Sequence, residues 1–375
     1  MKRTLCCLVA VCLLLAPTAR GETLAVEAAS CLLMEKATGQ VLYALNEREK
    51  LPPASVTKVM TILLTMEAIA SGAVDYDDVV TASAYAGSMG GSQIWLKENE
   101  QMTVRDMLKA VCVASANDCS VALAEHLAGS CDAFVEQMNR RAQELGMEDT
   151  TFKNPTGLPE EGHLTSARDI ALMSRELMLR HPQVKEFTTI WMDSLRDGTF
   201  GLNNTNKLIR YYPGATGLKT GSTDEALYCL SATAERDGME LIAVVLKSPT
   251  STQRFESAKV LLNYGFAAYS LAEVALPETE PIPVTMGEEV WVQPVLEDGA
   301  PLLVSREQRG GLEVQVELEP SLCAPVEQGQ TVGQLTVRSG GETLSVRPLT
   351  ADRSVARLTY GQLLLRCMRM AFHGG

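Results

Sequence analysis

The sequence predicts an α+β protein in which helices flank an antiparallel sheet, followed by a small all-β domain. Apolar residues recur at helical spacing between positions 59 and 70, which indicates a helix with one face turned to a core. Two apolar runs, 226–234 and 239–247, are joined by Glu235-Arg236-Asp237-Gly238, which is typical of an antiparallel hairpin. From residue 284 onward, short apolar segments alternate with glycine turns, which indicates a second, all-β unit.

Length, charge and the N-terminal residues limit the possible functions. A chain of 375 residues is comfortable for two domains, and its formal charge of −13 argues against a general nucleic-acid binder, because phosphate contacts need basic surface. Residues 1–21 combine a charged start, an apolar run and a small-residue processing site, so we interpret them as a signal peptide. Their removal changes the charge to −16, since Lys2, Arg3 and Arg20 are lost. An uncleaved N-terminal anchor is the alternative, and both interpretations predict an exported protein.

The cysteines give no metal or redox motif. Seven of the ten follow the predicted signal peptide, and none of these forms a C-x-x-C pair. We expect most of them to be small buried hydrophobic side chains. No nucleotide motif is present, so the sequence predicts neither a metal site nor a cofactor.

The predicted N-terminal domain, residues 22–272, begins with a strand hairpin at 28–45 and then reaches Pro52-Pro53-Ala54-Ser55-Val56-Thr57-Lys58. The two prolines prevent a helix from starting earlier. Ser55 and Lys58 are therefore expected on one face of the first helical turn. A lysine kept neutral by desolvation can take the proton of a serine hydroxyl, and a helix N-terminus favours negative charge at Ser55. An N-capping serine followed by a surface lysine is the alternative.

A tight connection between two helices is expected to carry Ser115 and Asn117. The helices are predicted over 103–114 and 119–127, with Thr103 as the first N-cap, and two more follow over 131–145 and up to about residue 180. A connection of this kind can project two side chains into a cleft. The alternative is a plain turn, because serine and asparagine are common turn residues.

Lys219-Thr220-Gly221 begins a strand just before the predicted hairpin. This triplet places a cation, a hydroxyl and an unobstructed backbone at a sheet edge, where they can hold a carboxylate and pair with an extended peptide. We expect Lys219 to face solvent. A surface turn leading into a strand is the alternative. A helix over 254–269 is predicted to close the domain.

The remaining residues divide into a linker, a β-rich domain and a C-terminal segment. Prolines mark the linker, 273–283, and the β-rich domain follows over 284–350. In the last segment, 351–375, one arc of a helical wheel is apolar and another is basic. The apolar arc holds Leu358, Leu364, Leu365, Met368 and Phe372, the basic arc holds Arg366, Arg369 and His373, and Arg353 and Arg357 add further positive charge. The segment is too short and too charged to span a bilayer, so it suits a helix lying at a membrane surface. Packing against the β-rich domain is the alternative.

Together, S-x-x-K at Ser55, S-x-N at Ser115 and K-T-G at Lys219 form a set that resembles the low-molecular-mass penicillin-binding proteins that are serine-type D-alanyl-D-alanine carboxypeptidases. The resemblance covers roughly residues 24–350. It includes Phe152-x-Asn154-Pro155-x-Gly157-Leu158, the segment around His163, and Tyr212-Pro213-Gly214. It implies a serine β-lactamase/DD-peptidase-like catalytic domain. Ala116 and Thr216 depart from the pattern, since many relatives have glycine and aspartate there.

The resemblance also implies a role for each motif residue. The catalytic group is Ser55 as the acylated nucleophile, Lys58 as its general base and Ser115 as a proton relay. The substrate-binding group is Asn117 for an amide, with Lys219 and Thr220 for the terminal carboxylate. The expected oxyanion hole consists of the backbone N–H groups of Ser55 and Ser222.

The resulting hypothesis is a carboxypeptidase that removes the terminal D-alanine from peptidoglycan stem peptides at the outer face of the cell membrane or in the wall. Penicillins are expected to inhibit it by acylating Ser55. A β-lactamase would need a second base in an E-x-x-L-N loop, and the chain has no such sequence. A non-catalytic penicillin-binding wall sensor is the other alternative, and the complete set of motif residues argues against it. A role in vegetative growth or in sporulation, and endopeptidase action on cross-links, stay open.

Overall fold

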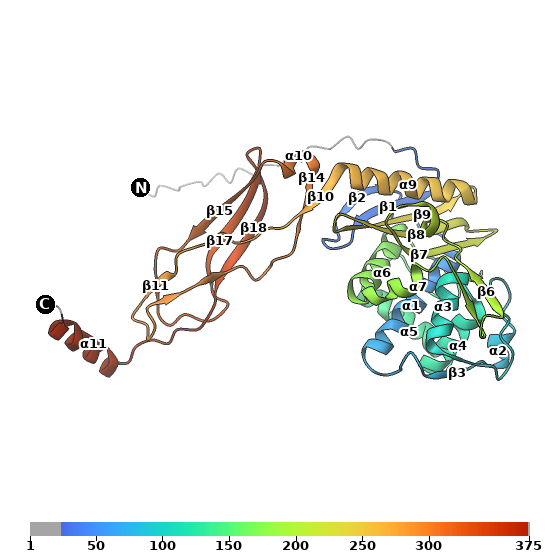
Figure 1. Ribbon diagram of the computed structural model, residues 1–375, viewed down its shortest axis with the longest axis horizontal. Coiled ribbons are helices and arrows are strands. Elements are labelled where there is room, and N and C mark those ends of the chain that lie inside the picture. The colour runs from blue at the N-terminus through green and yellow to red at the C-terminus, as the bar shows by residue number, and fades with distance from the viewer. Residues whose placement is uncertain (1–23, 374–375) are drawn as a thin grey trace, which may run out of the picture.

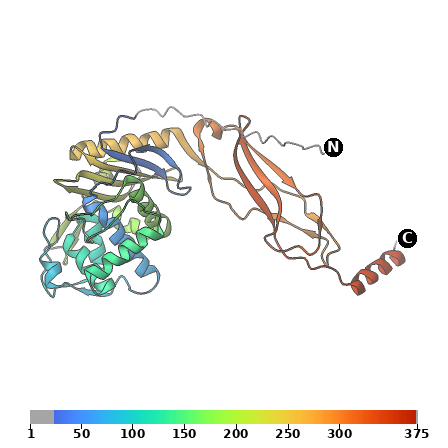
Figure 2. The same ribbon diagram turned by 180° about the vertical axis from the view of Figure 1, so that it is seen from behind.

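The computed structural model describes residues 24–373, so the predicted signal peptide lies outside the described residues. The molecule is elongated, with a mixed helix and sheet domain at one end, a β-rich domain in the middle and a short helix at the other end (Figure 1). The same order is seen from behind (Figure 2). The predicted α+β class with a following all-β domain is confirmed.

A five-stranded antiparallel sheet organises the first domain. The strand order is β2-β1-β9-β8-β7, so the hairpin predicted from the sequence lies beside the first strand of the domain and β7 lies at an edge. The strands are β1 (Ser30–Glu35), β2 (Val41–Leu45), β7 (Ala215–Thr223), β8 (Leu227–Arg236) and β9 (Met239–Ser248). Because β9 is buried on both faces, it is apolar along nearly its whole length.

Alternate side chains of the sheet enter two different hydrophobic cores. Leu32, Ile242 and Val244 belong to the larger core, which the sheet shares with a group of helices. The intervening residues, such as Leu33 and Ala243, belong to a second core under α9 (Ser251–Ala268). Figure 1 accordingly shows α9 along one face of the sheet and the other long helices on the opposite face. Because successive side chains of a strand point to opposite faces of the sheet, the same strands contribute to both cores.

The helical layer supplies the segments that later form the site. Its long helices are α1 (Lys58–Ala70), α3 (Val104–Ala114), α4 (Asn117–Ala128), α5 (Cys131–Glu144) and α6 (Ala167–Arg180), and a 3₁₀ turn, η1 (Ala54–Thr57), leads directly into α1. Thr103 caps its helix through its side-chain oxygen, as predicted, and Ser130 caps α5 in the same way. Helix α4 begins at Asn117, two residues before the predicted start at Cys119. Asp118 lies in the first turn, where a negative charge is favourable, and its carboxylate accepts hydrogen bonds from the backbone N–H groups of Cys119 and Ile94.

Short elements join these layers. They are α2 (Ala84–Gly87), α7 (Lys185–Thr188), α8 (Leu208–Tyr211), the pair β3 (Val79–Thr81) and β4 (Gln101–Thr103), and the pair β5 (Met192–Leu195) and β6 (Phe200–Asn203). The pair β5 and β6 lies within the polar, glycine-rich stretch that precedes β7.

The β-rich domain is tied to the first domain by one strand pairing. Strand β10 (Tyr269–Ala272) directly follows α9 and pairs with β14 (Leu302–Ser305), which leads into the single-turn helix α10 (Arg306–Arg309). The other strands of this domain are β11 (Ile282–Thr285), β12 (Trp291–Val292), β13 (Pro294–Val295), β15 (Leu312–Leu318), β16 (Leu322–Cys323), β17 (Thr331–Ser339) and β18 (Glu342–Ala351). They enclose a separate small core.

The C-terminal segment differs from the expectation in where its helix begins. Helix α11 covers Tyr360–His373, whereas residues 351–357 still contact the β-rich domain. Arg353 forms an ion pair with Asp352 and lies over the ring of Trp291, so it belongs to that domain and not to the helix. Leu358 likewise precedes the helix. Among residues 24–373, no helix is long and apolar enough to cross a membrane.

Candidate active site

The first turn of the η1–α1 helix brings Ser55 and Lys58 together. Lys58 Nζ lies 2.9 Å from Ser55 Oγ, the i to i+3 contact that the spacing predicts. Ser55 is half-buried, whereas Lys58 is fully buried, with 0% of its surface exposed. A lysine on a helix surface normally extends into water, so this burial rules out the alternative of a surface lysine.

Two further oxygens surround the Lys58 amine. Its nitrogen lies 2.6 Å from Asn117 Oδ1 and 2.7 Å from the carbonyl oxygen of Thr156. Both oxygens are acceptors without a proton of their own, so Lys58 must donate to each of them. A neutral amine has two N–H groups and one lone pair, and these two bonds use both N–H groups. The lone pair is then left for the Ser55 hydroxyl.

The connection between α3 and α4 supplies Ser115 and Asn117. Ser115 has a left-handed backbone conformation, with φ of 63°, which ends α3 and turns its hydroxyl toward β7. Its Oγ lies 2.8 Å from Lys219 Nζ. Asn117 donates from Nδ2 to the carbonyl of Gly90 and from its backbone to the carbonyl of Ser92. These bonds fix its amide so that Oδ1 faces Lys58 and one Nδ2 hydrogen is left over.

Lys219 and Thr220 come from the edge strand β7. Lys219 is only 1% exposed, so the expectation that it faces solvent is wrong. Although β7 is an edge strand, the connection between α3 and α4 covers it at this point, and Lys219 donates to Ser115 and to the Thr220 carbonyl. The Thr220 hydroxyl pairs with that of Thr205 at 2.7 Å.

Gly221 allows β7 to pass close to the start of the Ser55 helix. A Cβ atom at this position would lie 2.8 Å from both the Pro53 carbonyl oxygen and the Ser55 nitrogen. Such a contact cannot be accommodated without moving the backbone. Only glycine therefore lets the strand and the helix start approach each other, which brings the two backbone segments of the predicted oxyanion hole, at Ser55 and Ser222, together.

Burial lowers the pKa of both lysines, and a neighbouring cation lowers each pKa further. Burial lowers the pKa of Lys58 well below its ordinary value, the Lys219 ammonium lowers it further, and Asp118 opposes the shift. Burial lowers the pKa of Lys219 to about 7, with Cys112 opposing this shift and Arg254 adding to it. A neutral Lys58 beside a charged Lys219 is the arrangement that a serine nucleophile and an anionic substrate require.

Three residues that support the site were not identified from the sequence. The carbonyl of Thr156 holds Lys58, and Thr205 holds Thr220. Arg254, in the first turn of α9, is buried under β7 and donates to the carbonyls of Gly221 and Cys229. Burial lowers its pKa to about 10. A carbonyl group has no signature in a sequence, and Arg254 lies more than thirty positions after the K-T-G motif, so only the fold reveals these contacts.

His163 lies below the site and does not enter it. Its Nδ1 accepts from the backbone N–H of Lys153, so Nε2 carries the proton and donates to Thr57 Oγ1 at 2.8 Å. Burial lowers the pKa of His163 to about 4, so the ring is neutral near pH 7. It therefore ties the 151–165 loop to the helix of Ser55. In residues 24–373 no group of three or more potential metal ligands occurs.

A serine activated by a buried lysine, together with a serine–lysine pair and a strand edge, defines a serine acyl-transfer enzyme of the S-x-x-K class. The chain belongs to the D-alanyl-D-alanine carboxypeptidase family, whose family model matches residues 17–250. A second family model, described as the C-terminal domain of penicillin-binding protein 5, matches residues 275–357. The resemblance noted in the sequence is thereby confirmed.

Curated relatives match nearly the whole chain. D-alanyl-D-alanine carboxypeptidase DacF of Bacillus subtilis is 40% identical over 363 residues, which are 93% of this chain and 91% of that protein. D-alanyl-D-alanine carboxypeptidase DacC of Escherichia coli is 32% identical and covers 96% of this chain and 93% of its own length.

Solved structures share the fold. Penicillin-binding protein 5 of Haemophilus influenzae matches with a TM-score of 0.79 at 29% identity, over 88% of this chain and 98% of that one. Penicillin-binding protein D2 of Listeria monocytogenes, solved in an ampicillin-bound form, matches with a TM-score of 0.60 at 32% identity, over 65% of this chain and 100% of that one. The first structure covers both domains and thus confirms the two-domain fold.

Proposed function

We propose that this protein removes the terminal D-alanine from peptidoglycan stem peptides through an acyl-enzyme on Ser55. The observation that carries the proposal is the Lys58 amine, which is buried, held by two acceptors and left with a lone pair for the Ser55 hydroxyl. The family membership and the names of the relatives support the same reaction.

Acylation begins when the Ser55 hydroxyl donates its proton to Lys58 and Oγ attacks the carbonyl carbon of the penultimate D-alanine. The backbone N–H groups of Ser55 and Ser222 stabilise the oxyanion, a kind of interaction worth roughly 3–4 kcal/mol per donor. The C–N bond then breaks, and the proton held by Lys58 is needed by the departing amine. Ser115 is the proposed relay, and its hydrogen bond to Lys219 orients its hydroxyl.

Lys219 and Thr220 give the site its preference for a free C-terminus. A charged Lys219 at the start of the K-T-G strand attracts the carboxylate of the terminal D-alanine, and Thr220 offers a hydroxyl beside it. The open edge of β7 and the spare Nδ2 hydrogen of Asn117 bind the peptide amides. Water then attacks the acyl-enzyme, with Lys58 again as the base, and releases the shortened peptide.

Penicillins fit the same scheme as covalent inhibitors, because their acyl group and carboxylate occupy the positions of the substrate groups. The relative from Listeria monocytogenes that was solved with ampicillin supports this part of the proposal. The chain lacks the E-x-x-L-N sequence that a β-lactamase would use for deacylation. A non-catalytic sensor would not need a desolvated base beside the nucleophile.

We also propose that the protein acts outside the cytoplasm, attached to the membrane surface through α11. The charged and apolar N-terminal residues support export. On α11 the side chains of Leu364, Leu365 and Met368 are exposed at 62%, 50% and 44%. An exposed apolar face on a short helix with a neighbouring arginine is typical of an interfacial anchor.

The replacement Ser55→Ala tests the acyl-enzyme. It should lower D-alanine release from a D-Ala-D-Ala peptide by at least ~10³-fold and abolish covalent labelling by a fluorescent penicillin, because the attacking oxygen is lost. Far-UV circular dichroism and the melting temperature should stay close to those of the parent. Labelling that persists in Ser55→Ala, or that maps to another serine, would overturn the assignment.

A further inference from the structure

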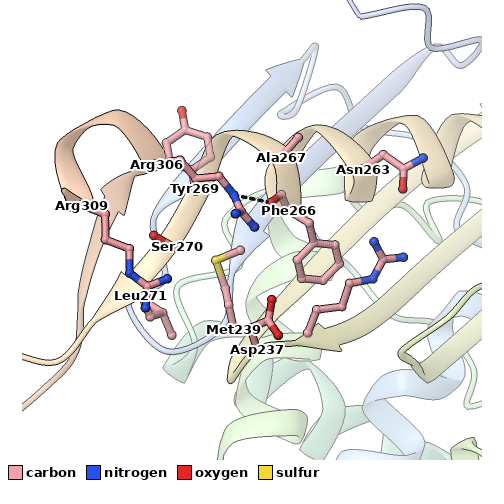
Figure 3. Close-up of a pocket in the computed structure, with 11 residues that line it drawn as sticks. Asp237, Met239, Asn263, Phe266, Ala267, Tyr269, Ser270, Leu271, Arg306 and Arg309 are labelled. Carbon is pink, nitrogen blue, oxygen red and sulfur yellow. Dashed lines mark hydrogen bonds between the residues drawn. The ribbon is translucent and has the colours of Figure 1, made fainter.

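A cavity of about 520 Å³ lies where the two domains meet, away from the candidate active site. Figure 3 shows it between the end of α9, the turn that joins β8 to β9, and helix α10. Arg236 at the end of β8 comes from the first domain, while Arg306 and Arg309 on α10 come from the β-rich domain. Both domains thus contribute cationic side chains to one hollow.

The three guanidinium groups have no carboxylate partner among residues 24–373. Arg306 donates from Nε to the Phe266 carbonyl at 3.1 Å, and Arg236 donates to the Pro213 carbonyl and lies over the Phe266 ring. Arg309 has neither a hydrogen bond nor an ion pair to any described residue. Most arginine N–H groups at this cavity are therefore available. Three arginines without a carboxylate partner at one cavity are unexpected in a protein whose net charge is −13.

A buried hydroxyl lines the same cavity. Ser270, on β10, is 6% exposed, and its Oγ has no hydrogen-bond partner in the described part of the chain. A buried hydroxyl without a partner costs free energy, so such groups are normally paired with the protein, with water or with a ligand. Figure 3 places Ser270 between the labelled arginines of α10 and Leu271. This second observation, independent of the arginines, points to a polar ligand, and a hydroxyl can donate to the same acceptor as the arginines.

We propose that this junction cavity is a binding site for the phosphate group of a small organic phosphate. The available donors come from three separate elements, β8, β10 and α10, and a tetrahedral phosphate can accept from several directions, whereas a carboxylate offers two oxygens in one plane. Met239, Phe266 and Leu271 also line the cavity and provide apolar contacts for the organic part. Asp237 also lines the cavity and weakens the positive field, although it forms no ion pair with these arginines.

The position of the cavity favours a soluble or wall-borne phosphate ester over a lipid headgroup. Helix α10 lies at the end of the β-rich domain that meets the first domain, whereas α11 lies at the opposite end of the β-rich domain in both views (Figures 1 and 2). If α11 rests on a membrane, the length of the β-rich domain separates the cavity from the bilayer. The phosphate site does not depend on the acyl-transfer chemistry at Ser55.

Glycerol 3-phosphate titrated into the full chain by isothermal calorimetry tests the proposal. We expect saturable binding that Arg309→Ala weakens about tenfold or more, because a charge-assisted bond is lost. The matched control is Arg338→Ala, because Arg338 is an exposed arginine on β17 with no described partner. This variant should leave binding unchanged. Asp237→Asn should strengthen binding several-fold, since it removes the one opposing charge and asparagine tolerates the positive φ of 50° at this turn.

The increase in affinity expected for Asp237→Asn distinguishes a binding site from damage to the fold, because a damaged fold would only weaken binding. Melting temperatures of all variants provide a second check. The absence of saturable binding, or an equal loss in Arg309→Ala and Arg338→Ala, would overturn the site. Tighter binding of glutarate than of glycerol 3-phosphate would overturn the assignment to phosphate. If the protein binds phosphatidylglycerol vesicles and Arg309→Ala weakens that binding, the assignment to a soluble or wall-borne ester is overturned.

Discussion

Two buried lysines in one site have opposite tasks, and their surroundings explain how. Lys58 is held by two acceptors that lack protons, and the Lys219 ammonium disfavours its charged form. Lys219 donates hydrogen bonds to the Ser115 hydroxyl and to the Thr220 carbonyl, and burial lowers its pKa to about 7. The same residue type thus serves as a neutral base in one position and as a cation in the other.

The replacement Lys219→Gln tests this electrostatic coupling. Because the Lys219 charge lowers the pKa of Lys58, its removal should raise that pKa, and acylation by penicillin should then require a higher pH. In a plot of the penicillin acylation rate against pH, the acidic limb should therefore shift to higher pH. Turnover of a peptide with a free carboxylate should also fall about tenfold to a hundredfold, since one charge-assisted bond of ~1.5–3 kcal/mol is lost.

Stopped-flow measurement of the penicillin acylation rate from pH 5 to pH 9 shows the position of this acidic limb directly. Lys207→Gln is the control, because it removes a lysine charge at an exposed position. An acidic limb that stays in place in Lys219→Gln would show that the two lysines are not coupled.

At this scale the sequence predicted which residues meet but not how they are buried. Ser55 with Lys58 and Ser115 with Asn117 are close in the chain, so local helix geometry is enough to place each pair. The pairing of Ser115 with Lys219 spans 104 positions and depends on how the helices cover the sheet edge. The burial of Lys219 has the same origin. No local pattern could report it, which is why the solvent-facing expectation failed.

At the scale of elements, caps and turns explain most of what could be predicted. The Thr103 cap and the hairpin turn have local causes, and the structure has the corresponding helix and strands, although the connection shortens from the expected four residues to Asp237-Gly238. Most of the described cysteines are buried, as expected: Cys31, Cys112, Cys119 and Cys229 are buried, Cys131 is half-buried and Cys323 is exposed. The pairing of β1 with β9 could not be derived, because the partner strands are some two hundred residues apart.

The contact between strand β7 and the start of α1 is the element-level feature that the site depends on. Gly221→Ala should lower the rate of penicillin acylation by at least about tenfold, because the added Cβ would meet Pro53 and Ser55 atoms at 2.8 Å and push the two N–H donors apart. Loss of one oxyanion donor alone can cost ~10²–10³-fold. Gly201→Ala is the matched control, since a Cβ at Gly201 meets nothing within 4 Å.

Melting temperatures measured for both variants distinguish a local effect at the site from general unfolding. Acylation at the parent rate in Gly221→Ala would mean that the close approach does not shape the oxyanion hole.

At the scale of the whole molecule, the β-rich domain separates the site from the C-terminal helix (Figure 1). The first domain holds every residue of the proposed chemistry. Among the α11 side chains that the structure describes, Gln362 bonds to Glu288 and Arg366 to the Gly287 carbonyl. An anchored α11 would therefore hold the active site away from the membrane, toward the wall. The sequence predicted the amphipathic helix from its period but not its start, because Asp352 and Val355 are retained by contacts with the β-rich domain.

Deleting residues 360–375 tests the anchor and spares those contacts. We expect the truncated protein to leave the membrane fraction while its rate of D-alanine release stays within about twofold of the parent, because the deletion is remote from Ser55. A pair of single replacements makes the test more specific. Leu364→Glu places a charge on the exposed apolar face and should weaken binding to anionic vesicles. Gln362→Glu adds the same charge outside that face and should weaken this binding less. Equal partitioning of the full and truncated proteins, or equal effects of the two glutamates, would mean that α11 does not anchor the protein through this face.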